Sequence, residues 1–262
     1  MFSSTTRGVA AAAGLALATA SLAACSPSSS DHGLAVVATT TQICDYVTQI
    51  AAKSADISLD KTDAAGKSSH VGAQKDGAAL TMSLTCLLAP NASAHEHEMT
   101  PAQTSALAQA DVMAVSGVDL EHFLDDAVVS SGFKGRMVVT SGVLTAADVD
   151  NPGAPDPEGA YTIDRGSERV DVAPWPFPPE EAGEEPEFRF DPHVWTSPKG
   201  ARVQVANLGA GLAAAAPDAA SSINAATASY LEDIDALDQW TAEAIETVPE
   251  GQRVLFTSHD AF

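Results

Sequence analysis

Short apolar segments alternate with segments of helical periodicity between residues 34 and 140, and this alternation limits the folds open to the chain. The expected strands cover residues 36–40, 82–88, 112–116 and 137–140. The expected helices cover residues 42–52, 101–109 and 120–130. Strands that alternate with helices are typical of a parallel sheet with helices on both faces. We therefore predict an α/β fold.

Two polar segments interrupt this pattern. Residues 60–77 are rich in Gly, Ser and Lys, and we expect a surface loop there. Residues 148–190 are rich in Pro, Gly and acidic side chains and contain neither His nor Cys. This composition predicts an exposed, partly mobile insertion.

Two helices are expected after the acidic insertion. Ser197 as the N-cap and Pro198 at the first helical position begin the first helix. Residues 218–247 keep helical spacing of apolar side chains, so the second helix would be roughly 45 Å long. A helix of that length suggests a stiff connector between two lobes. Residues 254–257 then read as a new strand.

The first 25 residues have the pattern of an export signal. One charge, Arg7, precedes an apolar run that is too short to span a bilayer comfortably. The segment ends Leu-Ala-Ala-Cys25, which resembles the lipobox of bacterial lipoproteins and predicts lipidation of Cys25. The alternative is an ordinary secretory signal with a chance cysteine. Residues 26–33 would form a flexible tether.

Export would place the other two cysteines in an oxidising compartment. Cys44 follows one expected strand and Cys86 lies in the next, so neighbouring strands could bring them to bonding distance. A disulfide and two buried thiols remain equally open interpretations.

The composition argues against one class of partner. Lys and Arg number 13 and Asp and Glu 35, which gives a formal net charge of −22. Such a surface repels phosphate backbones, so no nucleic-acid partner is expected. Apolar residues make up 45% of the chain, a normal fraction for a globular protein with a packed core.

Three histidines occupy equivalent places in the expected topology. His95 follows a strand and precedes a capped helix, His193 also precedes a capped helix, and His259 follows a strand. Ligands of open α/β sheets bind outside the carboxyl ends of strands, and neutral imidazoles suit zinc. The alternative for each residue is a hydrogen-bonded loop histidine. The other histidines expected at the surface are His32, His70 and His122.

Four segments together resemble the ZnuA/TroA-like solute-binding proteins of metal ABC transporters. They are residues 37–43 (VATTTQI), 87–101 (LLAPNASAHEHEMTP), 191–195 (DPHVW) and 257–262 (TSHDAF). Their order and spacing fit the family, as does the long helix. The resemblance covers residues 34–262 apart from the polar loop and the acidic insertion.

The resemblance implies two α/β lobes joined by a rigid helix, with one metal ion between them. By motif position the metal ligands would be His95, His193 and His259. His97 stands where the family often has an aromatic residue, so it is not expected to be a ligand. A histidine rather than a glutamate at position 259 favours zinc over manganese.

In the family the pattern continues beyond the motif that corresponds to residues 257–262, with a further part of the second lobe that supplies a carboxylate ligand. We therefore expect an incomplete C-terminal lobe and a fourth ligand beyond residue 262. A site completed by water, Glu96 or Asp260 is the alternative. The expected organisation is a lipoprotein signal peptide at 1–25, a tether at 26–33, an α/β lobe at 34–216 with an acidic insertion at 148–190, a linking helix at 217–247 and the start of a truncated lobe at 248–262.

The resemblance implies a binding protein and not an enzyme. We expect it to bind zinc, or alternatively manganese, as transported cargo and to deliver the ion to an ABC permease and its ATPase. It would be a monomer held by its lipid anchor at the extracytoplasmic face of the bacterial cell membrane. One alternative is an anchored surface adhesin with a structural metal. A weaker one is a zinc hydrolase that uses an open coordination position.

Overall fold

The computed structural model describes residues 1, 33–153, 155–156, 159–179 and 183–255. Residues 32–262 form one unit, and of the other unit, residues 1–31, only Met1 is described. The predicted signal peptide, the lipidation site Cys25 and the tether up to residue 32 therefore lie outside the described residues. No helix in the described part combines the length and apolar character needed to cross a membrane.

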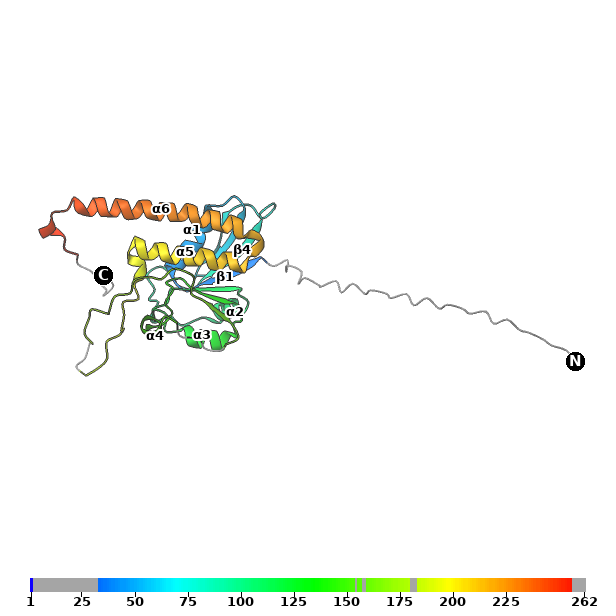
Figure 1. Cartoon of the computed structure of the whole chain (residues 1–262), viewed down its shortest axis with the longest axis horizontal. Helices are drawn as coiled ribbons and strands as arrows, with labels where there is room; N and C mark the ends of the chain where they lie inside the picture. The colour runs from blue at the N-terminus through cyan, green and yellow to red at the C-terminus, as the bar shows by residue number, and fades with distance from the viewer. Residues whose placement is uncertain (2–32, 154, 157–158, 180–182, 256–262) are drawn as a thin grey trace. The chain divides into compact units, whose positions relative to one another are not determined.

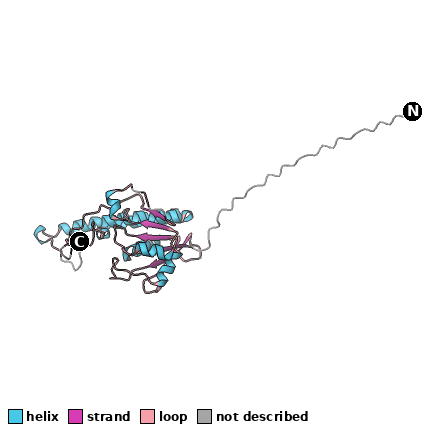
Figure 2. Ribbon diagram, turned by 90° about the horizontal axis from the view of Figure 1, so that it is seen from below, coloured by secondary structure: helices cyan, strands magenta, loops and turns pink. Residues whose placement is uncertain are grey.

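A seven-stranded sheet forms the centre of the fold (Figure 2). Its strands are β1 (Leu34–Ala38), β2 (Ile57–Thr62), β3 (Ser68–Gly72), β4 (Leu80–Cys86), β5 (Val112–Val115), β6 (Arg136–Val139) and β7 (Thr162–Asp164). Their order across the sheet is β3-β2-β4-β1-β5-β6-β7. Only the β2–β3 pair is antiparallel among these strands. Strand β1 lies between β4 and β5 and pairs with both in parallel. The carboxyl ends of all three strands therefore lie at the same edge of the sheet.

Helices cover both faces of the sheet (Figure 1). The helices are α1 (Thr41–Ala52), α2 (Pro101–Ala108), α3 (Leu124–Ser131), α4 (Ala146–Asp150), α5 (Pro198–Ala215) and α6 (Ala220–Glu246), with short 3₁₀ turns at Val194–Thr196, Pro217–Ala219 and Glu250–Gln252. Alternate side chains of β1 point to opposite faces. Val36 packs with α1, α5 and α6, and Val37 packs with α2 and α3. The predicted α/β fold with a helix-flanked parallel sheet is therefore confirmed.

The helix starts follow their sequence signals. Thr100 and Gln103 form a capping box at α2, with hydrogen bonds of 2.9 and 3.3 Å. Ser197 accepts a hydrogen bond from the Gly200 N–H at 3.2 Å, and Pro198 begins α5. Side-chain caps satisfy N–H groups that have no partner inside the helix. These two caps place the segments before them, which carry His95 and His193.

The prediction of a surface loop at residues 60–77 was wrong. The segment contains the end of β2 and all of β3, which pair as a hairpin. Ile57 and Leu59 are fully buried, and they join β2 to the core and to β4. The polar residues that suggested a loop lie on the exposed strand β3 and at the turns, where edge strands commonly carry polar side chains.

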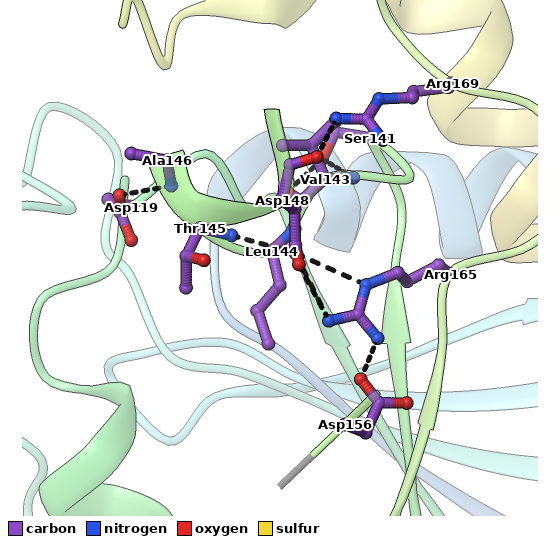
Figure 3. A network of polar contacts seen from close by, with 10 residues as sticks. All are labelled: Asp119, Ser141, Val143, Leu144, Thr145, Ala146, Asp148, Asp156, Arg165 and Arg169. Carbon is purple, nitrogen blue, oxygen red and sulfur yellow. Dashed lines mark hydrogen bonds and ion pairs between the residues drawn. The ribbon is translucent and has the colours of Figure 1, made fainter. Parts of the chain in front are cut away.

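The acidic insertion is also more ordered than its composition predicts. Its strand β7 adds to the sheet beside β6. Figure 3 shows the Asp148 carboxylate at the centre of a polar network, where it accepts hydrogen bonds from the N–H groups of Leu144 (2.8 Å) and Thr145 (3.2 Å). Arg165 pairs with Asp148 at 3.2 Å and also with Asp156. Asp148 is only 8% exposed, so this end of the insertion belongs to the folded core.

The long helix α6 packs along α5 by its first half (Figure 1). Ile223 and Ala226 are buried there. The second half exposes large apolar side chains, including Leu237 (50%) and Trp240 (64%). The strand expected at residues 254–257 does not form at its first two positions, and the other two lie outside the described residues.

Cys44 of α1 and Cys86 at the end of β4 are joined by a disulfide, with their Cα atoms 5.6 Å apart. Both side chains are buried. The bond fastens α1 to the sheet where β4 runs into the segment that carries His95. It connects positions separated by 42 residues.

We expect the Cys44→Ser/Cys86→Ser double variant to lose about 3–4 kcal/mol of unfolding free energy, because the disulfide restricts the unfolded chain. Urea unfolding of the two proteins under oxidising conditions measures the difference. The control is the unsubstituted protein with reductant, which should match the variant. An unfolding midpoint that does not respond to reductant would contradict the disulfide.

We expect Asp148→Asn to lower the unfolding free energy by about 2–3 kcal/mol, because two part-buried N–H groups and an arginine lose a charged acceptor. Urea unfolding measures this change as well. Asp150→Asn is the matched control, since its pair with Arg189 is exposed and should contribute no more than about 0.5 kcal/mol. Equal effects of the two substitutions would show that the Asp148 network does not stabilise the fold.

Candidate metal centre

His95 lies in the loop between β4 and α2, beyond the carboxyl end of β4. Its side chain is half-buried, and its Nδ1 lies 3.2 Å from the backbone carbonyl oxygen of Leu120. A carbonyl only accepts hydrogen bonds, so Nδ1 must be the protonated nitrogen of the neutral ring. The ring lone pair is then on Nε2, the nitrogen suited to bind a metal ion.

His193 is held in the same way by a carboxylate. It lies just before the 3₁₀ turn that leads into α5, and it is 4% exposed. Asp191 Oδ1 accepts hydrogen bonds from the His193 ring Nδ1 (2.8 Å) and backbone N–H (3.0 Å). A carboxylate behind an imidazole fixes the ring orientation and raises its basicity as a metal ligand.

The two rings lie close together although 98 positions separate them in the sequence. Their centroids are 5.5 Å apart and their planes are nearly perpendicular, at 79°. Two imidazoles on one tetrahedral zinc ion have centroids about 5 Å apart, given a Zn–N distance of about 2.0–2.1 Å. The spacing of His95 and His193 therefore fits a shared metal ion with little adjustment.

Aromatic side chains enclose the histidine pair. Phe188 is buried, and its ring centroid lies 4.9 Å from that of His95 and 6.4 Å from that of His193. Trp175 and Trp195 pack against His193, with ring centroids 6.0 and 5.3 Å from that of the imidazole. These rings restrict water around the imidazoles and lower the local polarity.

Trp175 and Phe188 reach the site from the acidic insertion. Two segments of the insertion, residues 173–179 and 183–191, pair with each other near residues 174 and 190. The pairing includes hydrogen bonds from Trp175 N–H to the Arg189 carbonyl (3.1 Å) and from Asp191 N–H to the Ala173 carbonyl (2.9 Å). The insertion thus supplies a wall of the site and not only solvated surface.

Burial lowers the pKa of His95, and the neighbouring His193 acts in the same direction. The hydrogen bond to the Leu120 carbonyl and the charge of Glu187 oppose this shift. A lowered pKa keeps the imidazole neutral, which is the form that binds metal ions.

The other candidate residues have different surroundings. His97 packs edge-on against Phe123 at 5.0 Å, as an aromatic side chain would, and burial lowers its pKa. His122 is exposed, and its ring centroid lies 6.2 Å from that of His95. Glu96 is exposed. His259 and Asp260 lie outside the described residues. No group of three or more His, Cys, Asp or Glu side chains is arranged to hold a metal ion within the part of the chain that the structure describes.

Some contributors could not be found from the residue pattern. Phe188 and Trp175 belong to a segment whose composition indicates a loop, and the Leu120 carbonyl has no sequence signal at all. Asp191 could have been predicted from the sequence, because a carboxylate two positions before a histidine is well placed to orient the imidazole.

Comparisons with known proteins find relatives that are named for metal binding. A family model described as ZnuA, zinc-uptake complex component A, periplasmic, matches residues 77–262. The manganese-binding lipoprotein MntA of Bacillus subtilis is 27% identical over 234 residues, which cover 89% of this chain and 57% of MntA. The iron-binding protein YfeA of Yersinia pestis is 27% identical over 173 residues, covering 66% of this chain and 45% of YfeA. The chain thus spans about half the length of these relatives.

Solved structures share the fold. Zn(II)-bound AdcA from Streptococcus pneumoniae superimposes with a TM-score of 0.51 at 18% identity, covering 81% of this chain and 32% of AdcA. The Mn-bound periplasmic metal-binding protein of Candidatus Liberibacter asiaticus gives a TM-score of 0.51 at 16% identity, covering 83% of this chain and 59% of that protein. Since the family model matches well over half of the sequence, the chain belongs to the ZnuA family.

Proposed function

We propose that this chain captures a transition-metal ion outside the cytoplasm and delivers it to an ABC-type importer. The observation that carries the proposal is the convergence of His95 and His193, each with its Nδ1 held by an acceptor. Family membership supports it, and so do the names of relatives that bind manganese and iron. His259 would be the third imidazole, and a fourth ligand would come from beyond residue 262.

Zinc is the ion that we propose as the cargo, with manganese as the alternative. Imidazole nitrogen suits zinc, whereas manganese is better served by carboxylate and water oxygens.

The remaining parts of the proposal concern place and partners. Lipidation of Cys25 would hold the protein at the extracytoplasmic face of the membrane, beside a permease and its ATPase, and raise its effective concentration there. The protein would act as a monomer, and its chemistry would be binding and release of the ion without catalysis.

We expect the full chain to bind Zn(II) more tightly than Mn(II) in isothermal titration. His193→Ala, His95→Ala and His259→Ala should each weaken zinc binding by about 100-fold or more, because each removes a direct ligand. His70→Ala is the matched control, since this exposed histidine pairs with Asp60 on the β2–β3 hairpin. It should leave the dissociation constant unchanged.

Three results would contradict the proposal. Zinc binding that survives His193→Ala would remove His193 from the ligand set. Tighter binding of manganese than of zinc would overturn the choice of metal. Absence of binding to either ion would favour the surface-adhesin interpretation instead.

The pH dependence of zinc affinity follows from the lowered pKa of His95. Protonation competes with the metal for the imidazole, and a lowered pKa delays that competition to more acidic pH. We therefore expect the affinity contributed by His95 to be constant above about pH 6.5, the ordinary histidine pKa, and to fall only below it. Zinc titrations between pH 5 and 8 measure this profile. A tenfold loss of affinity already between pH 8 and pH 7 would contradict it.

A further inference from the structure

The loop that contacts His95 follows an unusual backbone path. It connects β5 to α3, and three successive residues have positive φ angles: Gly117 (88°), Val118 (58°) and Asp119 (56°). Positive φ is unfavourable for residues other than glycine, and most of all for a β-branched residue such as Val118. A backbone of this kind persists only when surrounding contacts hold it, and such strain is concentrated at functional sites.

The side chain of Glu121 is one of those contacts. Its carboxylate accepts hydrogen bonds from Thr39 Oγ1 (2.6 Å), Ser116 N–H (2.7 Å) and Gly117 N–H (3.0 Å). Glu121 is only 4% exposed, and Thr39 is fully buried. The carboxylate therefore joins the ends of β1 and β5 and holds the first residue of the left-handed run.

The far side of the loop is held by backbone groups. Val118 N–H donates to the Val143 carbonyl (2.8 Å), and Asp119 N–H donates to the Leu144 carbonyl (3.1 Å). With both sides fixed, the fully buried Leu120 presents its carbonyl to Nδ1 of His95. A continuous chain of contacts thus runs from Glu121 through its loop to the orientation of the imidazole.

We propose that Glu121 is a positioning residue for the metal centre: its carboxylate holds the loop of residues 116–122 so that the Leu120 carbonyl fixes the Nδ1–H tautomer of His95. Glu121 does not bind the ion itself. The proposal deepens the proposed function, because the consequence for zinc depends on His95 being a ligand. The tautomer of His95 is a property of the metal-free protein and can be tested separately.

Glutamine at position 121 is a sharp probe of this arrangement. All three groups around the carboxylate donate hydrogen bonds, two to Oε1 and one to Oε2. An amide has only one acceptor oxygen, so in either orientation its NH₂ group opposes at least one donor. The orientation that keeps Thr39 and Ser116 breaks the bond to Gly117, where the left-handed path begins.

The experiment compares the full chain with its Glu121→Gln variant. Nitrogen-15 NMR of the imidazoles without metal reports the tautomer of His95, and titration calorimetry reports zinc affinity. We expect the variant to lose the uniform Nδ1–H tautomer at His95 while His193 keeps its own. Zinc binding should weaken by about 10–100-fold, the usual effect of losing an orienting partner.

Asn207→Ala is the matched control for a general loss of stability. Asn207 is also buried, and its amide makes three hydrogen bonds, to Glu168 N–H, the Thr140 carbonyl and the Glu168 carbonyl. It lies on α5 and does not contact the loop of residues 116–122 through any of these bonds. Asn207→Ala should lower the melting temperature but leave the His95 tautomer and zinc affinity unchanged.

Thr39→Val provides a second, milder variant in case Glu121→Gln does not fold. It removes one donor to the carboxylate and keeps the shape of the side chain, so a smaller shift in the tautomer population is expected.

An unchanged His95 tautomer in the folded variants would overturn the proposal. So would an Asn207→Ala variant that disturbs His95 as strongly. A wild-type chain that shows the Nδ1–H tautomer but binds no zinc would overturn the proposed function and leave the positioning role intact.

Discussion

The parallel pairing of β1 with both β4 and β5 is the constraint on which the rest of the structure depends. Because parallel strands point the same way, the segments that leave β4 and β5 emerge at one edge of the sheet, on either side of β1. His95 arrives with the first segment and the Leu120 carbonyl with the second. A crevice where successive strands lie on opposite sides of a central strand is the usual ligand-binding place in this class of fold.

At that crevice hydrogen bonds to the Nδ1 atoms of His95 and His193 orient the two imidazoles. A backbone carbonyl holds His95 and a carboxylate holds His193, so both rings have the same tautomer by different means. The surrounding rings of Phe188, Trp175 and Trp195 limit water and rotation. Pre-oriented ligands lose little entropy when they bind an ion, which is a condition for tight capture.

Acidic and polar segments of the chain contribute more to this arrangement than their composition suggests. The insertion that reads as a solvated loop anchors Asp148 in the core, adds β7 to the sheet and brings Phe188 against His95. The glycines, serines and lysines of residues 60–77 likewise led to the prediction of a loop where β2 and β3 form a hairpin. Composition reports the average exposure of a segment, whereas a few buried positions such as Ile57 and Leu59 decide its structure.

The sequence by itself determined the α/β class, the caps at Thr100 and Ser197, the long helix α6 and the candidate ligands His95 and His193. These are local signals: periodicity, capping residues and short motifs act within a few positions of the chain. Only the tertiary structure decided that Cys44 and Cys86 are bonded, that Phe188 and Trp175 enclose the histidines, and that Glu121 meets Thr39 beside the loop that contacts His95. Those contacts join residues far apart in the chain, and their partners are set by strand order and register, which no local pattern encodes.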